Sequence, residues 1–464
     1  TSSVSVIYPT NLPPGDSAYE QPFNVYGPAG SLAFRDTPLV INSGTASFGN
    51  PETDGFGWDS ASKTLTLSGL CLVTDQSYAI SLSTDAIVET SADTVNIAKL
   101  TAALGNTEVV YGNANLEFKG QGSLMLLASS ATTWSEALYL ANGNLTVTDG
   151  DLITIGASAA LSGGIHTSSG SVSFNGGTVL AAGGHATNYN FGVNSEKTIT
   201  IAPGARIASL SGVAGNDSQA LIAEQAGIAV NGGYLLASAG YSSAANSLAV
   251  QAGNGDMAVS GGIVKALAGG CSGNSYGIRL LDGADPDTFG AFHGSAGVVL
   301  TSSGGIGNRN YAIECAGNLY QTGGQLLALA TRPGTISGYA FGAYADTATL
   351  EGGGLTALGA YAKYSTGLAA TLELMGGQTV AVGANADTES NGVQGPTMAV
   401  SGGELWAVSG NASFTRGVFL YTDLYVQHSG EVYLRSGDSG GGDSHALWTP
   451  LAAGSIVLIG GRLE

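Results

Sequence analysis

The chain has 464 residues, of which only 10% are charged, 44% are hydrophobic and 73 are glycine. With this share of hydrophobic residues the chain can form a core, so it is not expected to be disordered. The glycines show no Gly-X-Y period, which excludes a collagen helix. A formal net charge of -20 disfavours nucleic acid and anionic membranes as partners. No apolar run reaches the roughly 18 residues that span a bilayer, so membrane insertion is not expected.

The N-terminal segment, residues 1–57, differs from the rest of the chain. Seven of the 12 prolines lie in it, and glycine turns are sparse. Because proline cannot donate a hydrogen bond to a β-ladder, we predict an extended or irregular segment with an edge strand at residues 4–7. The chain begins without methionine, which fits a processed, secreted protein. Low charge and few lysines suggest the outside of a bacterial cell, so we expect an extracellular or cell-surface location.

A repeated phrase follows the N-terminal segment. It consists of two alternating apolar residues, a Gly-Gly turn and a second alternating stretch that ends in alanine. Its clearest copies lie at residues 172–181, 228–237, 257–266 and 398–407. A second phrase precedes it, in which Ser, Asn or Thr stands before a small and an apolar residue, and we interpret it as a third strand or a corner. A repeat of about 24 to 31 residues with three short strands is typical of a solenoid.

We therefore predict an all-β fold, a right-handed parallel β-helix over residues 58–464 with about 12 turns stacked at about 4.8 Å. An irregular, proline-rich N-terminal cap is expected over residues 1–57. A solenoid has to hide its first open turn from edge-to-edge pairing, which is the reason to expect the cap. A segment donated to a neighbouring molecule is the alternative.

Alternation after the Gly-Gly turn predicts which side chains point outward. The second and fourth residues after the turn are apolar or small and are predicted to point inward. The third residues then form an outward ladder along one face: Leu180, Leu236, Lys265, Leu327, Val380, Trp406 and Tyr433.

A mostly apolar outward ladder has three explanations. The N-terminal segment or a loop covers it, it contacts a protein partner or another copy of the chain, or it binds carbohydrate. In the third case the predicted ligand-binding residues are Trp406, Tyr433 and Tyr234, because aromatic rings stack on the apolar faces of sugars.

One acidic loop is a candidate metal site. Asp282, Asp285 and Asp287 place three carboxylates within six residues, which favours calcium. The loop lacks the full ligand spacing of an EF-hand, so a solvated insertion is the alternative. No other cofactor is predicted.

Catalytic patterns are sparse. Catalysis on such a fold needs carboxylates on facing positions of adjacent turns, and the regular strands carry almost none. The five histidines lack a paired Ser, Cys or metal-ligand pattern. An enzyme is therefore disfavoured, and a polysaccharide lyase or hydrolase that uses the loop at residues 282–287 with His293 is the remaining alternative.

The three cysteines are Cys71, Cys271 and Cys315. Their spacing matches no zinc or redox motif, so we interpret them as small buried hydrophobic residues. A bridge between Cys271 and Cys315 is the alternative.

Two resemblances bear on function. The repeat over roughly residues 60–464 resembles the right-handed parallel β-helix superfamily typified by pectate lyases, although the catalytic residues of the lyases have no evident counterpart here. The opening from Gly57-Trp58-Asp59 through Thr64-Leu65-Thr66-Leu67 is similar to secreted surface proteins of Gram-positive gut bacteria that are described as carbohydrate-binding. These resemblances imply a carbohydrate-binding or adhesion module at the cell surface, with a glycan or a surface protein as partner. A structural or self-assembling surface protein without a small ligand is the alternative.

Overall fold

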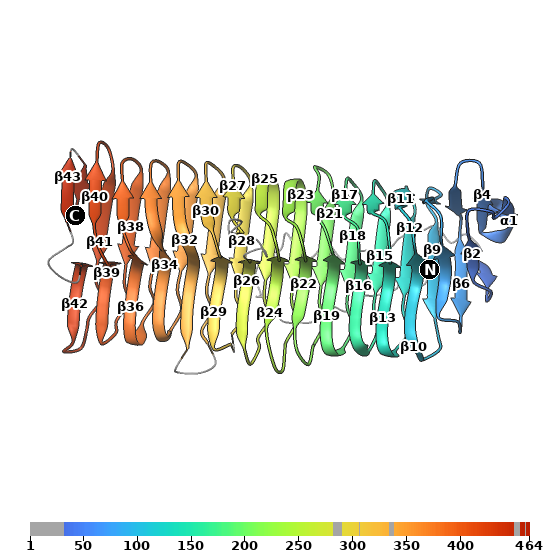
Figure 1. Cartoon of the computed structure of the whole chain (residues 1–464), viewed down its shortest axis with the longest axis horizontal. Helices are drawn as coiled ribbons and strands as arrows, with labels where there is room; N and C mark the ends of the chain where they lie inside the picture. Colours follow the sequence, from blue (N-terminus) through green and yellow to red (C-terminus); the bar gives the residue numbers. More distant parts are fainter. Residues whose placement is uncertain (1–31, 282–289, 306, 334–337, 450–454, 460) are drawn as a thin grey trace.

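The computed structural model describes residues 32–281, 290–305, 307–333, 338–449, 455–459 and 461–464. It is an all-β, parallel β-solenoid of about 13 turns, and Figure 1 shows these turns stacked into a rod. The predicted fold class is therefore confirmed. The edge strand expected at residues 4–7 lies outside the described residues.

Each turn contributes strands to three parallel sheets, which we number by their order within a turn. Four long strands continue from one sheet into the next, β23 and β25 from the second into the third and β32 and β34 from the first into the second.

The first sheet consists of β2 (Leu39–Ile41), β7 (Tyr78–Leu82), β10 (Leu104–Gly112), β13 (Ala131–Leu140), β16 (Ala159–Thr167), β19 (Ala186–Ser195), β22 (Ser218–Ala223), β24 (Ser247–Ala252), β26 (Asn274–Leu280), β29 (Arg309–Cys315), β32 (Tyr339–Leu350), β34 (Ala362–Leu374), β36 (Ala386–Gly395), β39 (Phe414–Leu420) and β42 (Asp443–Trp448). The second consists of β5 (Thr64–Leu67), β8 (Ala86–Thr90), β11 (Leu116–Gly120), β14 (Leu145–Val147), β17 (Val172–Phe174), β20 (Ile199–Ile201), β23 (Ile228–Ser238), β25 (Met257–Leu267), β27 (Phe292–Gly294), β30 (Asn318–Gln321), parts of β32 and β34, β37 (Met398–Val400), β40 (Leu424–Gln427) and β43 (Ile456–Ile459). The third consists of β1 (Ala33–Arg35), β6 (Leu70–Thr74), β9 (Val95–Leu100), β12 (Ser123–Leu127), β15 (Asp151–Ile155), β18 (Thr178–Ala182), β21 (Arg206–Leu210), parts of β23 and β25, β28 (Val298–Ser302), β31 (Gln325–Leu329), β33 (Gly354–Leu358), β35 (Gln378–Val382), β38 (Glu404–Val408), β41 (Glu431–Arg435) and β44 (Arg462–Leu463).

The N-terminal end of the rod carries the antiparallel strands. β3 (Phe48–Asn50), the single-turn helix α1 (Pro51–Asp54) and β4 (Phe56–Asp59) lead into β5, and β3–β4 and β4–β5 are antiparallel pairs (Figure 1). Earlier in the chain, β1 and β2 pair in parallel with β6 and β7. Parallel pairing thus starts within the span expected as a cap, whose first 31 residues lie outside the described part. The division of the chain at residues 57 and 58 stays a prediction.

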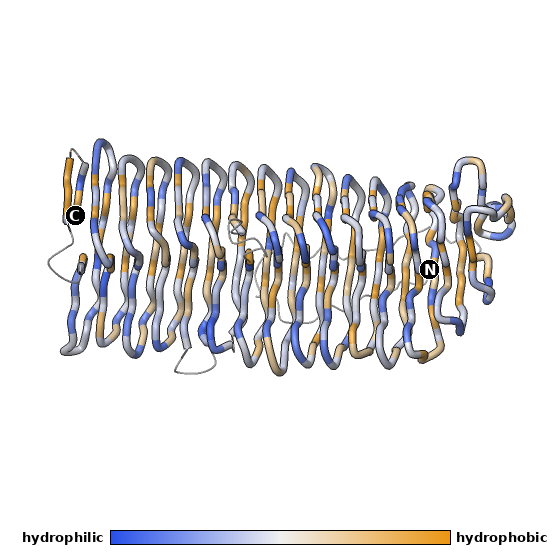
Figure 2. The backbone as a smooth tube through the Cα atoms, in the orientation of Figure 1, coloured by the Kyte–Doolittle hydropathy of each residue, from blue (hydrophilic) through white to orange (hydrophobic). Residues whose placement is uncertain are grey.

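The Gly-Gly turns and the alternation that follows them have the predicted geometry. At Gly233, the second glycine of its pair, φ is +72°, and an added Cβ would lie 2.4 Å from the carbonyl oxygen of Ala205, so a side chain is excluded there. Hydrophobic and hydrophilic residues alternate along the strands (Figure 2). The second residues after the turn, such as Val179 and Leu405, are buried, whereas Trp406 is 41% exposed. The predicted inward and outward sides are therefore confirmed.

A buried row of hydroxyl and amide side chains ties neighbouring turns together inside the first sheet. Ser247 donates a hydrogen bond to the carbonyl of Gly240 in its own turn (3.0 Å) and accepts one from the backbone N–H of Gly269 in the next (2.8 Å). The row explains the Ser, Asn or Thr of the second phrase. Its buried members are Thr107, Ser135, Ser162, Asn190, Ser218, Ser247, Ser275, Asn310, Ser365, Ser390 and Thr415, and the exposed Ser444 ends the row.

Removal of one of these hydroxyl groups is expected to be costly. Ser247→Ala removes the side-chain partner of two partly buried backbone groups, the Gly240 carbonyl and the Gly269 N–H, and should lower the free energy of unfolding by about 1–3 kcal/mol. Urea denaturation checks this, with the exposed Ser260→Ala as the matched control. Equal effects of the two substitutions would contradict the role of the row.

The small residue of the second phrase lies where the first sheet bends inward. In each strand of this sheet from β13 to β39, an Ala or Gly is skipped in the pairing register, as Gly392 is between Asn391 and Val393. A Cβ on Gly392 would lie 2.5 Å from the backbone nitrogen of Val408 in the third sheet. The bend therefore brings the backbones of the two sheets almost into contact.

All three cysteines are free and buried, so the alternative bridge between Cys271 and Cys315 is absent. Burial raises the pKa of the Cys271 thiol to about 11 and also raises the pKa of Cys71 and Cys315. We expect no rapid reaction with a thiol reagent at pH 8 in the folded protein and three reactive thiols in urea. Fast labelling of Cys271 or Cys315 without denaturant would contradict this burial.

Candidate functional site

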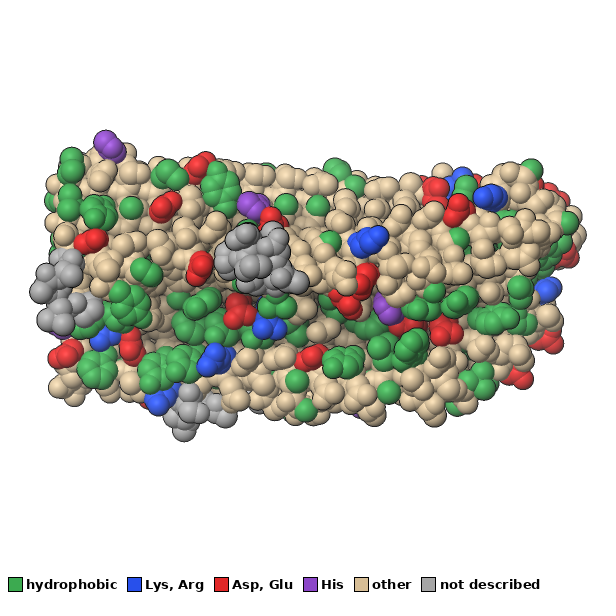
Figure 3. All heavy atoms as spheres, in the orientation of Figure 1, with side chains coloured by type: hydrophobic (Ala, Val, Ile, Leu, Met, Phe, Trp, Pro, Cys, Tyr) green, Lys and Arg blue, Asp and Glu red, His purple; other side chains and the backbone are tan. Residues whose placement is uncertain are grey.

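The candidate site is a band of side chains on the outer side of the inward bend. Two rows of the first sheet form it, one on each side of the small bend residue, and we call them together the aromatic band. The first row is Glu108, Glu136, Gly163, Phe191, Gln219, Leu248, Tyr276, Tyr311, Phe341, Thr366, Asn391, Arg416 and His445; the second is Tyr111, Tyr139, His166, Asn194, Ile222, Gln251, Arg279, Glu314, Tyr344, Ala369, Gln394, Phe419 and Trp448. Figure 3 shows hydrophobic, acidic and basic side chains gathered in such a lengthwise band.

The N-terminal part of the band contains a carboxylate–histidine cluster. Glu108 and Glu136 face each other in register on β10 and β13, and Glu136 Oε1 lies 2.7 Å from His166 Nδ1 on β16. The Glu136 side chain is only 1% exposed, whereas His166 is partly open to solvent. The buried carboxylate therefore fixes the orientation of a histidine that faces the surface.

Proton binding in this cluster is shifted toward neutral pH. Burial, and after it the charge of Glu136, raises the pKa of Glu108 to about 7. Burial alone would lower the pKa of His166, but the hydrogen bond and the charge of Glu136 outweigh it, and the net result is a raised pKa. Both groups thus keep their protons to a higher pH than in an unfolded chain.

The middle of the band is a stack of aromatic rings. Tyr276, Tyr311 and Phe341 stack with ring centroids 5.4 and 5.1 Å apart and planes within 6° of each other. The ring of Tyr344 stands nearly perpendicular to the last two, at 79° and 76°, and is 43% exposed. Arg279 Nε donates to Glu314 Oε2 at 3.0 Å beside the stack. Burial raises the pKa of Tyr311 to about 12, so this ring stays neutral.

The C-terminal part of the band is built around a buried arginine. Arg416 Nη1 donates to Glu389 Oε1 at 2.8 Å, and its guanidinium lies 4.5 Å from the ring centroids of both Phe419 and Trp448. An aromatic ring this close to a guanidinium attracts its positive charge and so stabilises a cation that is shielded from water. Both arginines of the band are thus paired with a glutamate and lie over aromatic rings.

The predicted ligand-binding residues lie on the third sheet, away from this band. Trp406 and Tyr433 are neighbours in register and stack at 4.3 Å with planes 13° apart. Their rings therefore cover one face of each other, and Arg462 lies over the Tyr433 ring. Tyr234 lies six strand spacings from Trp406, about 29 Å along the rod. The structure thus brings two of the three residues together and not the third.

The outward row that contains Trp406 and Tyr433 varies in exposure. Met125, Ile153, Leu180 and Ala208 in this row are buried and form a cluster of their own, whereas Leu236 and Leu327 are partly exposed. The expectation that the N-terminal segment covers the row concerns residues 1–31, which lie outside the described part.

The predicted calcium ligands Asp282, Asp285 and Asp287 also lie outside the described residues. Elsewhere in the described chain, no group of three or more His, Cys, Asp or Glu side chains could hold a metal ion. His293 is described, and its Nε2 lies 3.3 Å from Asp256 Oδ2 on the surface of the second sheet. In the same described ranges, no helix has the length and apolar character needed to cross a membrane.

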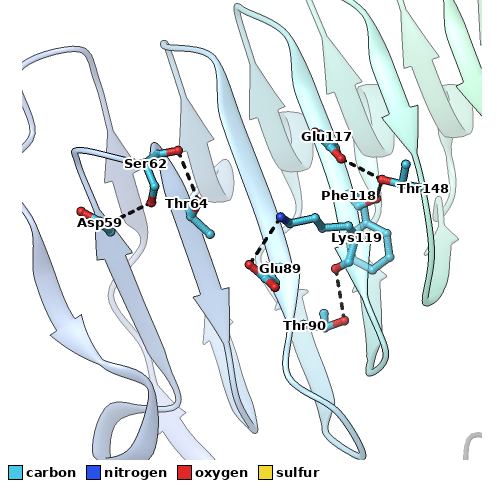
Figure 4. Close-up of polar contacts among 9 residues, drawn as sticks. All are labelled: Asp59, Ser62, Thr64, Glu89, Thr90, Glu117, Phe118, Lys119 and Thr148. Carbon is cyan, nitrogen blue, oxygen red and sulfur yellow. Dashed lines mark hydrogen bonds and ion pairs between the residues drawn. The ribbon is translucent and has the colours of Figure 1, made fainter.

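A second surface feature is a shallow depression of about 510 Å³ on the second sheet. Glu89 and Lys119 form an exposed ion pair of 3.7 Å at it, and Thr148 Oγ1 donates to Glu117 Oε1 at 2.9 Å (Figure 4). Exposed ion pairs contribute little, and no aromatic ring lines the depression. The aromatic band is therefore the stronger candidate.

The band was missed in the sequence, although its strands were recognised by their second phrase. The expectation that the strands carry almost no facing carboxylates is wrong for Glu108 and Glu136, which are 28 residues apart in the chain and adjacent in register. His166, for which no Ser, Cys or metal-ligand pattern was expected, is bonded instead to the Glu136 carboxylate. One feature of the sequence indicates the band. The residue that follows the Ser, Asn or Thr of the second phrase is often aromatic or charged, as are Glu136, Tyr276, Tyr311 and Arg416.

Comparison of the chain with family models, with curated proteins and with solved structures gave no match. The β-solenoid is thus the part of the resemblance that the structure supports, and no family is identified.

Proposed function

We propose that this chain binds an extended carbohydrate along the aromatic band, as a binding or adhesion module outside the cell. The observation that carries the proposal is the continuity of the band. It joins aromatic rings, of which Tyr344 is exposed, and polar side chains in two rows that run along the rod.

Two exposed rings, one beside the N-terminal part of the band and one in its middle, are far apart. Trp134 on β13 is 38% exposed and flanks Tyr139 of the band at 6.4 Å between centroids, and Tyr344 on β32 is 43% exposed. Seven strand spacings separate their strands, or about 34 Å. A single ligand that contacts both rings has to be a chain of several sugar units.

The groups between the rings suit sugar hydroxyls. His166, Asn194, Gln251 and the pair of Arg279 with Glu314 offer both donors and acceptors along the second row. Aromatic rings contribute the apolar contacts that sugar C–H faces require. This combination distinguishes the band from the third-sheet ladder, whose two large rings mainly contact each other.

Glycan-array binding with matched variants tests the proposal. Trp134→Ala and Tyr344→Ala should each weaken binding of a long oligosaccharide at least fivefold, and Trp406→Ala on the third sheet should leave it unchanged. Affinity should also rise with oligosaccharide length. A blank array, or a loss seen with Trp406→Ala alone, would reject the band as the binding surface.

Self-association is a second candidate function, and one observation favours it. The outward row of the third sheet carries the partly exposed apolar side chains Leu236, Leu300, Leu327 and Val380, which would fit the same row of a second copy. Sedimentation should then show a mass that rises with concentration, and Leu327→Lys should abolish the rise. Lys265 already occupies this row, so lysine fits the fold there. A monomer at every concentration would reject this candidate.

A further inference from the structure

Two buried acceptor oxygens lie without a partner on either side of His166. Glu136 Oε2 and Asn194 Oδ1 make no hydrogen bond, although Glu136 is 1% and Asn194 8% exposed. They belong to β13 and β19, the two strands that pair with β16. A buried acceptor without a donor costs about 1–3 kcal/mol, so such atoms call for an explanation.

We propose that Glu136, His166 and Asn194 form a subsite for one uncharged, hydroxyl-rich sugar unit, which donates hydrogen bonds to the two unpartnered oxygens. The inference rests on the proposed carbohydrate binding and adds the class of sugar that this part of the band accepts.

The other polar contacts in the subsite leave these two acceptors in place. Glu136 Oε1 is held by His166 Nδ1 at 2.7 Å, and Asn194 Nδ2 donates to Glu224 Oε1 at 2.7 Å. A proton on Glu108 could satisfy Glu136, which it faces in register, but Asn194 lies on the opposite side of His166. The orientation of both side chains is therefore fixed, and a ligand hydroxyl completes the hydrogen bonding of Asn194 in any protonation state of Glu108.

Charge determines which sugars fit. Glu136 is bonded to His166, Glu224 is bonded to Asn194, and Glu108 faces Glu136 in register, while the charge of Glu196 also acts on His166. Ionised carboxylates only accept hydrogen bonds, so a hydroxyl group is a suitable partner for them. A sugar carboxylate or sulfate would meet like charges and would be repelled. The subsite should therefore select neutral sugars over uronic acids.

The test compares two forms of the same oligosaccharides. Hexamers of cellulose, mannan and galactan are titrated calorimetrically against the whole chain at pH 8, each beside its C6-oxidised form, in which a carboxylate replaces the C6 hydroxyl. At least one neutral hexamer should bind, and its oxidised form should bind at least tenfold more weakly. Asn194→Leu and Glu136→Gln should each weaken the neutral hexamer about tenfold. Asn231→Leu, at an exposed position of β23, serves as the control and should bind as the unsubstituted chain does.

The outcomes separate the subsite from the function on which it rests. Binding of a neutral hexamer that neither variant weakens would overturn the subsite and leave the proposed function standing. Equal or tighter binding of the oxidised form would overturn the selection for neutral sugars. No binding of any hexamer would overturn both. Circular dichroism checks that each variant is folded, and if Glu136→Gln is not, Asn194→Leu still decides between these outcomes.

Discussion

Glu108→Gln is expected to leave stability at pH 4 unchanged and to raise the free energy of unfolding at pH 8 by about 3 kcal/mol. The reason is that Glu108 is buried beside Glu136, so its pKa rises from 4.5 in the unfolded chain to about 7 in the folded protein. A raised carboxyl pKa stabilises the fold fully below pH 4.5, and that contribution is lost as the pH rises through 7. Glutamine resembles the protonated form and therefore avoids the loss.

Urea denaturation of both proteins at pH 4, 6 and 8 measures this effect. The difference between variant and unsubstituted chain should grow across this range, because only the unsubstituted chain loses the Glu108 contribution. Glu373→Gln, at an exposed position of β34, is the control and should show a nearly constant difference. A parallel pH profile for Glu108→Gln would mean that Glu108 titrates normally and that the cluster is solvated.

Gly392→Val is expected to destabilise the protein by at least about 3 kcal/mol or to prevent folding of the turns around it. An added Cβ would lie 2.5 Å from the backbone nitrogen of Val408 and 2.5 Å from the carbonyl oxygen of Gly417. These neighbours are backbone atoms, which cannot move aside by a change of rotamer. The first and third sheets would have to separate at this turn, and the hydrogen bonds to the adjacent turns would be strained.

Gly105→Val is the matched control for this substitution. Gly105 lies in β10 of the same sheet, and an added Cβ there would have no atom within 4 Å. Its effect should stay within about 0.5 kcal/mol, as for an exposed surface change. Unfolding midpoints in urea compare the two variants, with Gly392→Ala as an intermediate step. Equal midpoints for Gly392→Val and Gly105→Val would contradict the close contact of the two sheets.

The parts of the fold that follow period two could be predicted from the sequence. The strand after each Gly-Gly turn alternates strictly, so the inward side of Leu405 and the outward side of Trp406 follow from their positions alone. That Trp406 and Tyr433 are neighbours also follows from the sequence, because they occupy equivalent positions in consecutive repeats. Tyr234 shares the outward face of the third sheet with them, but it lies six strand spacings away from Trp406.

The aromatic band could not be predicted in the same way, because the inward bend interrupts the alternation. Four consecutive residues, Ser135 to Leu138, are buried in β13, and such a run does not distinguish an outward glutamate at the bend from an inward one. Recognition of the pair with Glu108 also requires the register of strands far apart in the chain. The unpartnered oxygens of Glu136 and Asn194 depend on side-chain positions that no sequence pattern encodes.

The local pairing of turns has a consequence for how this protein could change in length. Each turn pairs only with the turn before and the turn after it, as β19 does with β16 and β22. Residues 228–256 are one such turn, because Ile228 is in register with Met257. Deletion of this segment would join equivalent points of the chain and restore every row, with Trp134 and Tyr344 closer by about 4.8 Å. The reach of the surface between these two rings is therefore adjustable in whole steps, by gain or loss of single turns, without redesign of either end.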